Sequence, residues 1–259
     1  MEPLKPKKSL GQHFLRDGNI IRKITDAIPL ENPSDLVLEI GPGTGTMTEV
    51  LLDRFKNVKA VEIDQRAVRF LNQKFPKLTV VHGNVLKISW DELLDHDGNI
   101  HIVGNLPYYI TSQILFAILE NRQHIQSAVL MMQKEVAARL VAVPRTKAYG
   151  ILSVQVQLMS SPEILFDVSP HVFYPPPKVT SSVVGFHFDQ PPLACSDKNL
   201  KTVVRTAFQQ RRKKLSNSLK GLEPLPDDPE FDYDARAEAW SPRTYEKLTA
   251  RFEQLGTLS

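Results

Sequence analysis

Short apolar runs alternate with longer amphipathic runs between about residues 36 and 188. The short runs are typical of buried strands, and the longer runs repeat apolar residues at helical spacing. Strands are therefore predicted at residues 36–40, 58–63, 78–83, 100–105 and 127–132. Helices are predicted between them, at residues 46–55, 65–75, 112–122 and 134–143. This alternation predicts an α/β fold with a parallel, doubly wound sheet and helices on both faces.

Later in the chain, EILFDVSP and SSVVGFHF predict two more strands, which could form an antiparallel edge of the sheet. The composition then shifts at residues 189–199, and a basic helix is predicted over 199–219. A final helix begins near Ser241, which is a plausible N-cap before Pro242. We therefore expect an α/β domain over residues 1–188 and a small helical domain over 189–259.

The composition is that of an ordinary globular protein, with 42% hydrophobic and 24% charged residues among 259. No apolar run approaches the roughly 20 residues that span a bilayer. The N-terminal stretch is basic and lacks the apolar segment of a secretory signal. The single cysteine, Cys195, excludes a disulfide within the chain and weakly favours a reducing compartment. These features predict a cytoplasmic protein without a membrane partner.

Basic residues are clustered although the net charge is only +3. One cluster comprises Lys5, Lys7 and Lys8, and the other runs from Arg211 through Arg212 and Lys213 to Lys214. One such cluster alone is explained about equally well by a solvent-exposed surface and by a site that binds a polyanion. Two clusters at distant positions favour a polyanionic partner, because neutralising phosphates requires such groups of cations.

A glycine-rich turn follows the first predicted strand, in LVLEIGPGTGTMTEVLL. Gly41, Gly43 and Gly45 leave room for a ligand near the backbone, and the next helix start offers unpaired N–H groups. Glu62 ends the second strand, where a carboxylate can accept hydrogen bonds from ribose hydroxyls, and Asn84 follows the third. The spacing differs from the dinucleotide pattern G-x-G-x-x-G. It therefore favours S-adenosylmethionine over NAD as the cofactor.

The stretch VGNLPYYI ends the fourth predicted strand at the same sheet edge. An exocyclic aromatic amine is a poor nucleophile, because its lone pair is delocalised into the ring. The Asn105 side-chain oxygen and the Leu106 carbonyl could accept its two hydrogens and aim the lone pair at a methyl sulfonium. Pro107 would fix the backbone, and Tyr108 would stack on a base that has left its helix. Alternatively, Asn105 only caps the next helix and the tyrosines belong to the core, which is the position we expect for Tyr109.

N-L-P-Y matches the [N/D]-[P/I/L]-P-[Y/F] signature of methyltransferases that act on nucleic-acid amines. The chain more closely resembles the KsgA (RsmA) family of ribosomal RNA adenine dimethyltransferases. The stretches that carry this resemblance cover nearly the whole chain in order. They are KKSLGQHFL, EIGPGTGTMT, VEID, GNLPYYITS, MMQKEVAARLVA, KAYGILSV, FYPPPKVTSSVV and FQQRRKKL. The resemblance implies a Rossmann-like S-adenosylmethionine-dependent methyltransferase domain with a small C-terminal helical domain.

The resemblance also implies roles for individual residues. It implies no metal site. The residues implied to contact the cofactor are His13, Leu15, Gly41, Gly43, Glu62, Asn84 and Asn105. Phe173 would pack against the flipped adenine, with a place in the core as the alternative. Gln12 and Phe14 would belong to a basic N-terminal lid segment, residues 1–18, that orders over the cofactor.

Family members dimethylate two adjacent adenosines in the 3′-terminal hairpin of 16S ribosomal RNA, on a pre-30S particle late in subunit assembly. By resemblance, we expect the same activity here, from a monomer whose two basic clusters contact the RNA. Two positions depart from the family pattern, where aspartate is common: Asn84 and Thr180. Asn84 can still accept a hydrogen bond from the cofactor's adenine amine, so we expect weaker cofactor binding and retained activity.

Other functions fit less well. An Erm-type enzyme would methylate 23S RNA, but KAYGILSV and PPPKV favour the KsgA family. A mitochondrial transcription-factor relative would only bind nucleic acid, whereas the complete N-L-P-Y and glycine turn indicate catalysis. A DNA adenine methyltransferase needs a larger target-recognition region than the roughly 70 residues beyond the α/β domain. A NAD-dependent enzyme lacks a residue for hydride transfer at the fourth strand.

Overall fold

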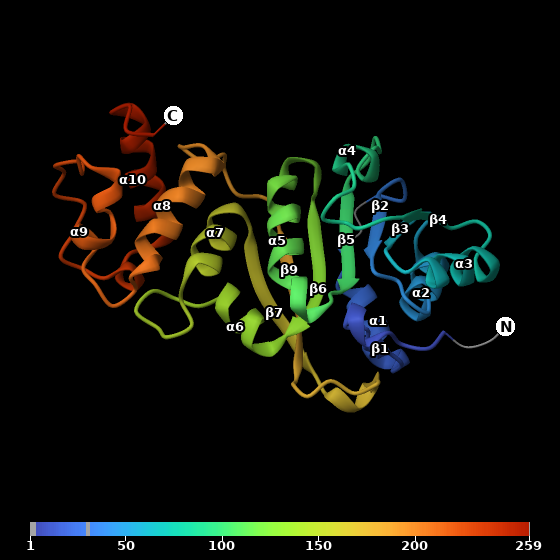
Figure 1. The fold of residues 1–259 in the computed structure, drawn as a ribbon. Helices are drawn as coiled ribbons and strands as arrows, with labels where there is room; N and C mark the ends of the chain where they lie inside the picture. Colours follow the sequence, from blue (N-terminus) through green and yellow to red (C-terminus); the bar gives the residue numbers. More distant parts are fainter. Residues whose placement is uncertain (1–3, 30–31, 259) are drawn as a thin grey trace. The chain divides into compact units, whose positions relative to one another are not determined.

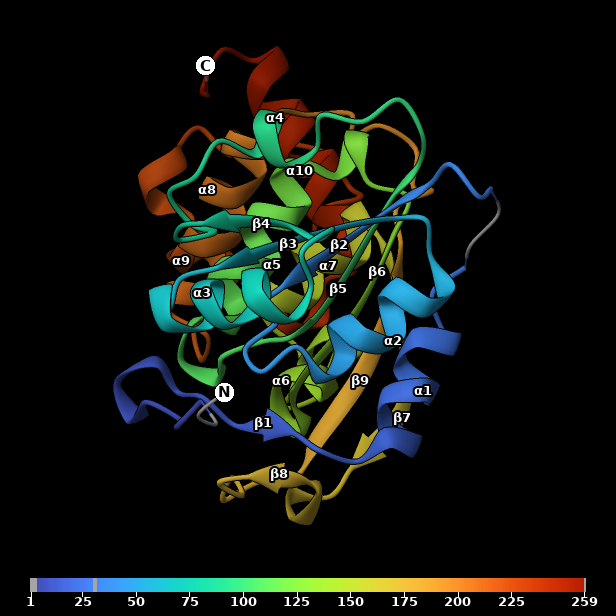
Figure 2. The same ribbon diagram turned by 90° about the vertical axis from the view of Figure 1, so that its right-hand side faces the viewer.

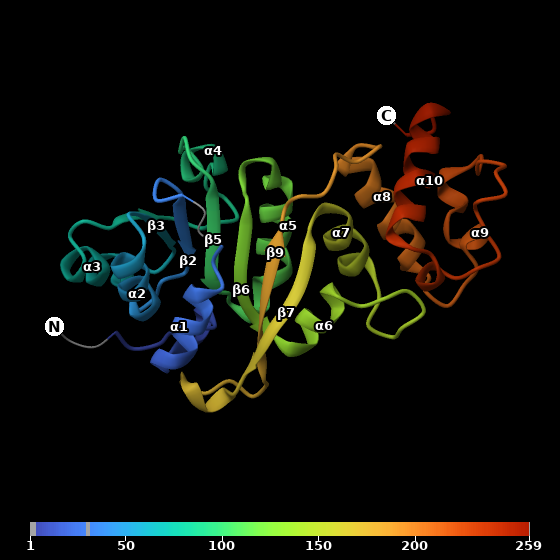
Figure 3. The same cartoon turned by 180° about the vertical axis from the view of Figure 1, so that it is seen from behind.

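A computed structural model describes residues 4–29 and 32–258, and within them seven strands form one large sheet (Figure 1). The strands follow the order β4-β3-β2-β5-β6-β9-β7. Their bounds, in that order, are Thr79–His82, Asn57–Glu62, Leu36–Ile40, Ile100–Asn105, Ser127–Gln133, Ser181–His187 and Ser161–Val168. Strands β2 to β6 pair in parallel, and β9 runs antiparallel to β6. The predicted parallel sheet with an antiparallel edge is therefore confirmed (Figure 3).

The strand order reverses beside β2. From β2 the chain builds outward through β3 and β4, and it then returns to place β5 on the other side of β2. In a sheet of this kind, ligands bind outside the carboxyl ends of the strands where the order reverses. The turns that follow β2, β3, β4 and β5 meet at this edge.

Helices cover both faces of the sheet, with α1 and α2 on one side and α5 on the other (Figure 2). The α-helices up to residue 140 are α1 (Gly18–Asp26), α2 (Thr46–Arg54), α3 (Gln65–Lys74), α4 (Trp90–Leu93), α5 (Thr111–Glu120) and α6 (Lys134–Leu140). Ile21 and Ile24 of α1 and Leu51 of α2 pack in one buried cluster with Val37 and Val103 of the sheet. Burial of this cluster stabilises the α/β layers.

A small antiparallel ribbon joins the N-terminal segment to the chain between β7 and β9. It consists of β1 (Phe14–Leu15) and β8 (Phe173–Tyr174), which lie side by side in Figure 2. Two short 3₁₀ turns precede these strands, η1 (Lys8–Leu10) and η4 (Pro170–Val172). Strands of two residues carry no periodic pattern, and none was predicted here.

The structure divides the chain differently from the expected boundary at residue 188. One compact unit takes the described residues of Met1–Ala137 and Glu163–Phe188, and the other takes those of Ala138–Pro162 and Asp189–Ser259. The second unit is helical, with α7 (Ile151–Met159), α8 (Asp197–Gln209), α9 (Leu215–Ser218), α10 (Pro242–Gln254) and two 3₁₀ turns, η5 (Lys220–Leu222) and η6 (Ala237–Ala239). Helix α7 joins this unit because it packs against α8 and α10.

An aromatic core holds the second unit together. Tyr149, Phe208, Trp240 and Tyr245 lie with neighbouring ring centroids 5.5–6.2 Å apart. The Tyr149 hydroxyl donates to the Trp240 carbonyl at 2.9 Å. The predicted cap of α10 is confirmed, since the Ser241 side chain accepts from an N–H in the first turn. The single basic helix predicted over 199–219 is wrong, because the chain leaves the helix after Gln209 and resumes only at Leu215.

Within the described ranges, no helix is both long and apolar enough to cross a membrane.

Candidate active site

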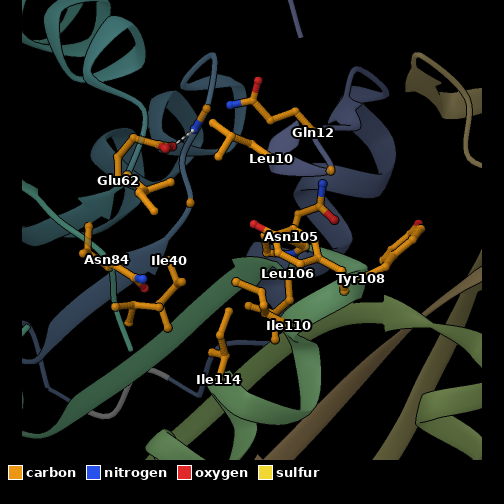
Figure 4. A pocket seen from close by; sticks show the side chains of 18 of the residues that line it. Leu10, Gln12, Ile40, Glu62, Asn84, Asn105, Leu106, Tyr108, Ile110 and Ile114 are labelled. Atoms are coloured by element: carbon orange, nitrogen blue, oxygen red, sulfur yellow. Dashed lines mark hydrogen bonds between the residues drawn. The ribbon is translucent and has the colours of Figure 1, made fainter. Parts of the chain in front are cut away.

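A cavity of about 310 Å³ lies at the carboxyl edge of the parallel strands (Figure 4). Its size is that of a small-molecule site. In Figure 4, Glu62 and Asn84 face Asn105 and Tyr108 across the cavity, and Leu10 and Gln12 reach it from the N-terminal segment. Most of the residues predicted from the sequence line it. They are His13, Gly41, Gly43, Glu62, Asn84, Asn105, Leu106, Pro107 and Tyr108.

The glycine turn forms one wall. Gly41 and Gly43 have φ angles of 72° and 54°, in the left-handed region that favours glycine. A Cβ atom on Gly43 would lie 2.8 Å from the Phe14 ring, so the lid segment packs closely on this turn. A Cβ atom on Gly41 would meet no other part of the described chain within 4 Å. The backbone at Gly41 therefore faces open cavity that a ligand could fill.

Glu62 is held at the end of β3 by two backbone donors. Its carboxylate accepts from the Gly43 N–H at 3.0 Å and from the Asp64 N–H at 2.8 Å. Burial raises the pKa of this carboxyl group above its ordinary value, although the two N–H bonds oppose the shift. A carboxylate offers about four acceptor positions, so Glu62 keeps capacity for ligand hydroxyls.

A second buried acid, Glu39, lies on the adjacent strand and does not line the cavity. It accepts a hydrogen bond of 2.6 Å from the Thr48 hydroxyl and so ties β2 to the first turn of α2. Burial raises the pKa of Glu39 from 4.5 to about 7; the Thr48 bond opposes this shift, and the charge of Glu62 adds to it. Glu39 therefore links the strand before the glycine turn to the helix after it.

We expect Glu39→Gln to remove one pH dependence of stability. Between pH 4.5 and about 7, Glu39 keeps its proton in the folded protein but loses it in the unfolded chain. The bound proton therefore stabilises the folded state at low pH, and this contribution declines as the pH rises through that window. At 1.36 kcal/mol per pKa unit the full loss is about 3 kcal/mol, and roughly 2 kcal/mol of it should appear in the wild-type free energy of unfolding, relative to the variant, between pH 5 and 7.5. Urea unfolding followed by circular dichroism at pH 5 and 7.5 measures this difference. Parallel pH profiles for the two proteins would contradict the prediction.

Asn84 closes the turn after β4. Its side-chain oxygen accepts from the Leu86 N–H at 3.0 Å, and its carbonyl accepts from the N–H groups of Lys87 and Ile88. The carboxamide lines the cavity with one oxygen lone pair already engaged. Asn84 can therefore offer a ligand both an acceptor and an N–H donor.

Asn105 does not cap the following helix. The N-cap positions of η2 (Tyr108–Ile110) and α5 are Pro107 and Ile110. The Asn105 amide instead donates to the His13 carbonyl at 2.9 Å. This bond fixes which end of the carboxamide is oxygen, so the acceptor remains available to the cavity. The adjacent Leu106 N–H donates to Met131 on β6 at 3.0 Å, which holds the backbone at this position.

The two tyrosines differ in their surroundings. Tyr108 lines the cavity, its hydroxyl lies 2.7 Å from the Ser181 hydroxyl, and its ring stacks on His13 with centroids 5.7 Å apart. Tyr109 also lines the cavity and is 58% exposed, so its expected place in the core is wrong. Its ring lies against Gly11, where a Cβ atom would be 3.1 Å away. The left-handed Gly11 turn thus brings the lid segment onto Tyr109.

The lid segment is anchored beside the cavity by Asp64. The Gln12 amide donates to the Asp64 carboxylate at 3.3 Å, and Lys7 lies 3.7 Å from it. Hydrogen bonds from Arg66 are the main reason that the pKa of Asp64 is lowered to about 2. Asp64 therefore stays charged and can hold the segment over a wide pH range. The first three residues of the predicted lid lie outside the described residues.

Leu15 and Phe173 do not line the cavity. They face each other across the β1–β8 ribbon and are 7% and 4% exposed, within the core cluster under the sheet. Their ribbon reaches the site through a different atom, the Pro175 carbonyl, which lies 2.7 Å from the His13 ring nitrogen. The cofactor contact of Leu15 and the adenine contact of Phe173 thus stay predictions.

The second basic cluster is partly engaged within its own unit. Arg211 donates to Glu238 at 2.8 Å and to the Thr146 carbonyl at 3.1 Å, and Lys214 lies 2.9 Å from Asp234. Within the described part of the chain, Arg212 and Lys213 are exposed and form no ion pair. The first cluster is also exposed, at Lys5, Lys7 and Lys8.

One further constellation lies at the amino ends of the strands. The His101 ring is 2.8 Å from the Ser127 hydroxyl and 3.4 Å from the Asp35 carboxylate. These residue types match a Ser-His-Asp triad, but none is more than 1% exposed. A hydroxyl buried to this degree is closed to substrates, so the set ties together the starts of β2, β5 and β6.

Comparison with known proteins identifies the family to which this site belongs. A sequence model described as ribosomal RNA adenine dimethylase matches residues 4–227. The chain belongs to this family. It is 44% identical to ribosomal RNA small subunit methyltransferase A of Porphyromonas gingivalis, over 98% of this chain and all of that protein. It is equally similar to the Flavobacterium johnsoniae protein of the same name, over the full length of both.

Two solved structures resemble the chain over most of its length. A dimethyladenosine transferase from Plasmodium falciparum is 27% identical, with a TM-score of 0.79 over 94% of this chain and 98% of that one. The 23S rRNA methyltransferase ErmE is 28% identical, with a TM-score of 0.67 over 93% and 100%. The expected family and the Rossmann-like methyltransferase fold are confirmed. The enzyme class and the cofactor, S-adenosylmethionine, are confirmed with them.

Proposed function

We propose that this enzyme transfers methyl groups from S-adenosylmethionine to the N6 amines of two adjacent adenosines in the 3′-terminal hairpin of 16S ribosomal RNA. The observation that carries the proposal is the placement of Asn105. Its amide nitrogen is engaged by the His13 carbonyl, and its oxygen shares a cavity with Glu62, the glycine turn and Tyr108. An amine acceptor therefore lies beside a site suited to an adenosyl group.

The cavity fits this cofactor. Glu62 would accept the ribose hydroxyls, Asn84 would bind the adenine, and the open backbone at Gly41 would lie along the ligand. His13 would cover it from the lid segment. When bound, S-adenosylmethionine supplies an electrophilic methyl group on a sulfonium.

The chain's own residues would prepare the amine for attack. The Asn105 oxygen and the Leu106 carbonyl accept the two amine hydrogens, which draws the nitrogen toward tetrahedral geometry and orients its lone pair. The Leu106 backbone is held by Met131, and the Asn105 side chain by His13, so both acceptors are positioned before the substrate arrives. The methylated ammonium is acidic and loses its proton to water, so no strong base is required.

The flipped adenine would stack on Tyr108, whose hydroxyl is fixed by Ser181. The His13 ring now covers part of Tyr108, so we propose that this ring shifts or forms the other side of the stack. We also keep the proposal that Phe173 packs near the base, which requires the β1–β8 ribbon to move from the position described. A monomer acting in the cytoplasm on a pre-30S particle completes the proposal.

The small-subunit substrate is favoured over the 23S substrate of ErmE by similarity along the whole chain. The relatives that share 44% identity are named for the small ribosomal subunit, whereas ErmE shares 28%. The family description, adenine dimethylase, points to adenine as the base, and the acceptor pair at the cavity suits its exocyclic N6 amine. The two exposed basic clusters are suited to RNA phosphates.

The decisive experiment is transfer of labelled methyl groups to three substrates: small subunits that lack the modification, large subunits and DNA. Mapping should find dimethyladenosine at two adjacent positions of 16S RNA. Product in 23S RNA or DNA, or no transfer to any substrate, would reject the proposal.

We expect charge reversal at Arg212 and Lys213 to weaken RNA binding by about tenfold or more and to lower its salt dependence by roughly one to two ion equivalents. Both side chains are exposed and unpaired within the described part of the chain, so they are available to phosphates. Binding to small subunits at several salt concentrations measures the effect, and cofactor affinity should not change. Arg211→Gln is the comparison, because Arg211 is engaged by Glu238 and should mainly affect stability. Equal loss of RNA and cofactor binding in the reversed variant would contradict the assignment.

A further inference from the structure

An arginine and a tyrosine form a stacked pair on the exposed side of the β1–β8 ribbon. The Arg16 guanidinium carbon lies 3.9 Å from the centroid of the Tyr174 ring. The pairing continues past β1, where the Arg16 N–H donates to the Val172 carbonyl at 2.9 Å, so Arg16 is diagonal to Tyr174 on the same face. Tyr174 is 47% exposed, and Arg16 is exposed as well. Both planar groups are therefore presented to solvent.

The opposite side of the ribbon is structural. Leu15 and Phe173 alternate with the exposed pair along the two strands and lie in the core cluster. In the conformation described, this packing positions Arg16 and Tyr174 through core contacts and not through each other; a movement of Phe173 toward the base would carry Tyr174 with it. A cation–π pair at an exposed site is itself worth only about 0.5–1 kcal/mol.

The two chain segments that form the ribbon contain cations and no carboxylate as far as Arg16; the next residue, Asp17, caps α1. Residues 4–16 and 169–180, which contain the two strands, include five lysines and arginines and no aspartate or glutamate: Lys5, Lys7, Lys8, Arg16 and Lys178. Within the described residues, Arg16 forms no ion pair with a carboxylate, so its charge is available. Surfaces that bind single-stranded nucleic acid typically combine aromatic rings, which stack on bases, with cations placed along the path of the phosphate backbone.

The pair also lies beside the amine-binding residues. Pro175, the residue after Tyr174, places its carbonyl 2.7 Å from the His13 ring, and that ring stacks on Tyr108. The His13 carbonyl is the partner of Asn105. A nucleic-acid strand that places a base against Tyr108 must therefore leave the cavity close to this ribbon.

We propose that Arg16 and Tyr174 form a stacking platform for an unpaired nucleotide adjacent to the target adenosine. The base would stack on an outer face of this guanidinium–phenol pair, and its phosphates would face Lys178 and the lid lysines. This proposal rests on the proposed function in one respect: the bound strand is taken to be the RNA substrate. It extends recognition beyond the target adenine to a neighbouring base, read by its aromatic face without selection among the four bases.

A binding experiment separates stacking from charge. The probes are a fluorescent, adenine-rich RNA octamer and the same octamer with every base removed, measured by anisotropy over a range of salt concentrations. Tyr174→Ala should raise the Kd of the intact octamer by about 5- to 100-fold, the range expected for one stacked base. It should leave the Kd of the abasic octamer and both salt slopes unchanged. Tyr174→Phe keeps the ring and should bind within twofold of wild type.

Two controls complete the design. Leu165→Ala removes another exposed apolar side chain of the same unit, on β7, and should bind both octamers as wild type does. Tyr174→Ala should also raise the KM for unmodified small subunits while kcat and the affinity for S-adenosylhomocysteine stay constant. Equal loss on both octamers, or no loss on either, would overturn the platform. If the wild type bound through Tyr174 but transferred no methyl group to RNA, the proposed function would fail while the platform stood.

Discussion

Replacing Asn105 with alanine is expected to reduce the rate of methyl transfer by about 100- to 1,000-fold, the cost of removing one preorganised partner of a reacting group. The variant loses the acceptor that orients the amine lone pair, and the Leu106 carbonyl alone cannot fix the direction of attack. Single-turnover transfer to unmodified small subunits, with saturating cofactor, measures this step separately from binding. Circular dichroism should show an unchanged fold, because Asn105 contributes its bond to the lid segment and none to the core.

Asn105→Ala also releases the His13 carbonyl, so a loosened lid must be distinguished from a lost acceptor. Gln12→Ala loosens the same segment by removing its contacts with Asp64 and with the Lys7 N–H, and it leaves Asn105 unchanged. This variant should bind cofactor a few-fold more weakly and react at nearly the wild-type rate when saturated. Asn105→Asp keeps an acceptor oxygen and should retain more activity than alanine. If Asn105→Ala reacted within fivefold of wild type, the acceptor role would be wrong.

The sheet could be predicted closely because its strands are buried on both faces. Residues 36–40 and 100–105 are mostly apolar runs without helical spacing, and the structure has strands with those same bounds. Helix α7 was missed, since Ile151–Met159 is apolar on nearly every side and lacks the amphipathic period that marks a surface helix. Its assignment to the second unit depends on packing against α8 and α10, which residues far along the sequence supply.

The site could be predicted where chemistry is local and not where it depends on distant backbone. Gly41, Glu62 and Asn84 were found because parallel strands bring their carboxyl ends to one edge. The partner that orients Asn105 is a carbonyl 92 positions away, and no side-chain pattern marks a carbonyl. Tyr109 was misplaced because nothing local in the sequence separates it from a core tyrosine; its ring is 58% exposed and contacts the Gly11 turn of the lid segment, which lies far away in the sequence. Arg16 lies just outside the stretches that carry the family resemblance, and Tyr174 lies within one without an assigned role, so only the pairing of two short strands brings them together.

Glu62→Ala is expected to weaken cofactor binding by about 100-fold or more, since each hydrogen bond to a charged group contributes about 1.5–3 kcal/mol and two ribose hydroxyls lose their acceptor. Part of the loss would come from the glycine turn, because the carboxylate also holds the Gly43 N–H. Glu62→Gln keeps a neutral acceptor and should lose about tenfold. Isothermal titration with S-adenosylhomocysteine gives the affinities without a contribution from the transfer step.

The pH dependence of cofactor binding tests whether the Glu62 carboxylate contacts the ribose directly. Burial raises the pKa of Glu62, so its carboxylate takes up a proton as the pH falls and loses acceptor capacity for the ribose. Wild-type affinity should therefore decline as the pH falls, and the decline should begin at a higher pH than an ordinary glutamate would give, whereas Glu62→Gln should bind with little change. Glu39→Gln removes a buried carboxylate from the neighbouring strand, outside the cavity, and should bind within about threefold of wild type at pH 8. If Glu39→Gln lost as much affinity as Glu62→Ala, Glu62 would act through the structure of this sheet edge and not through direct contact with the ribose.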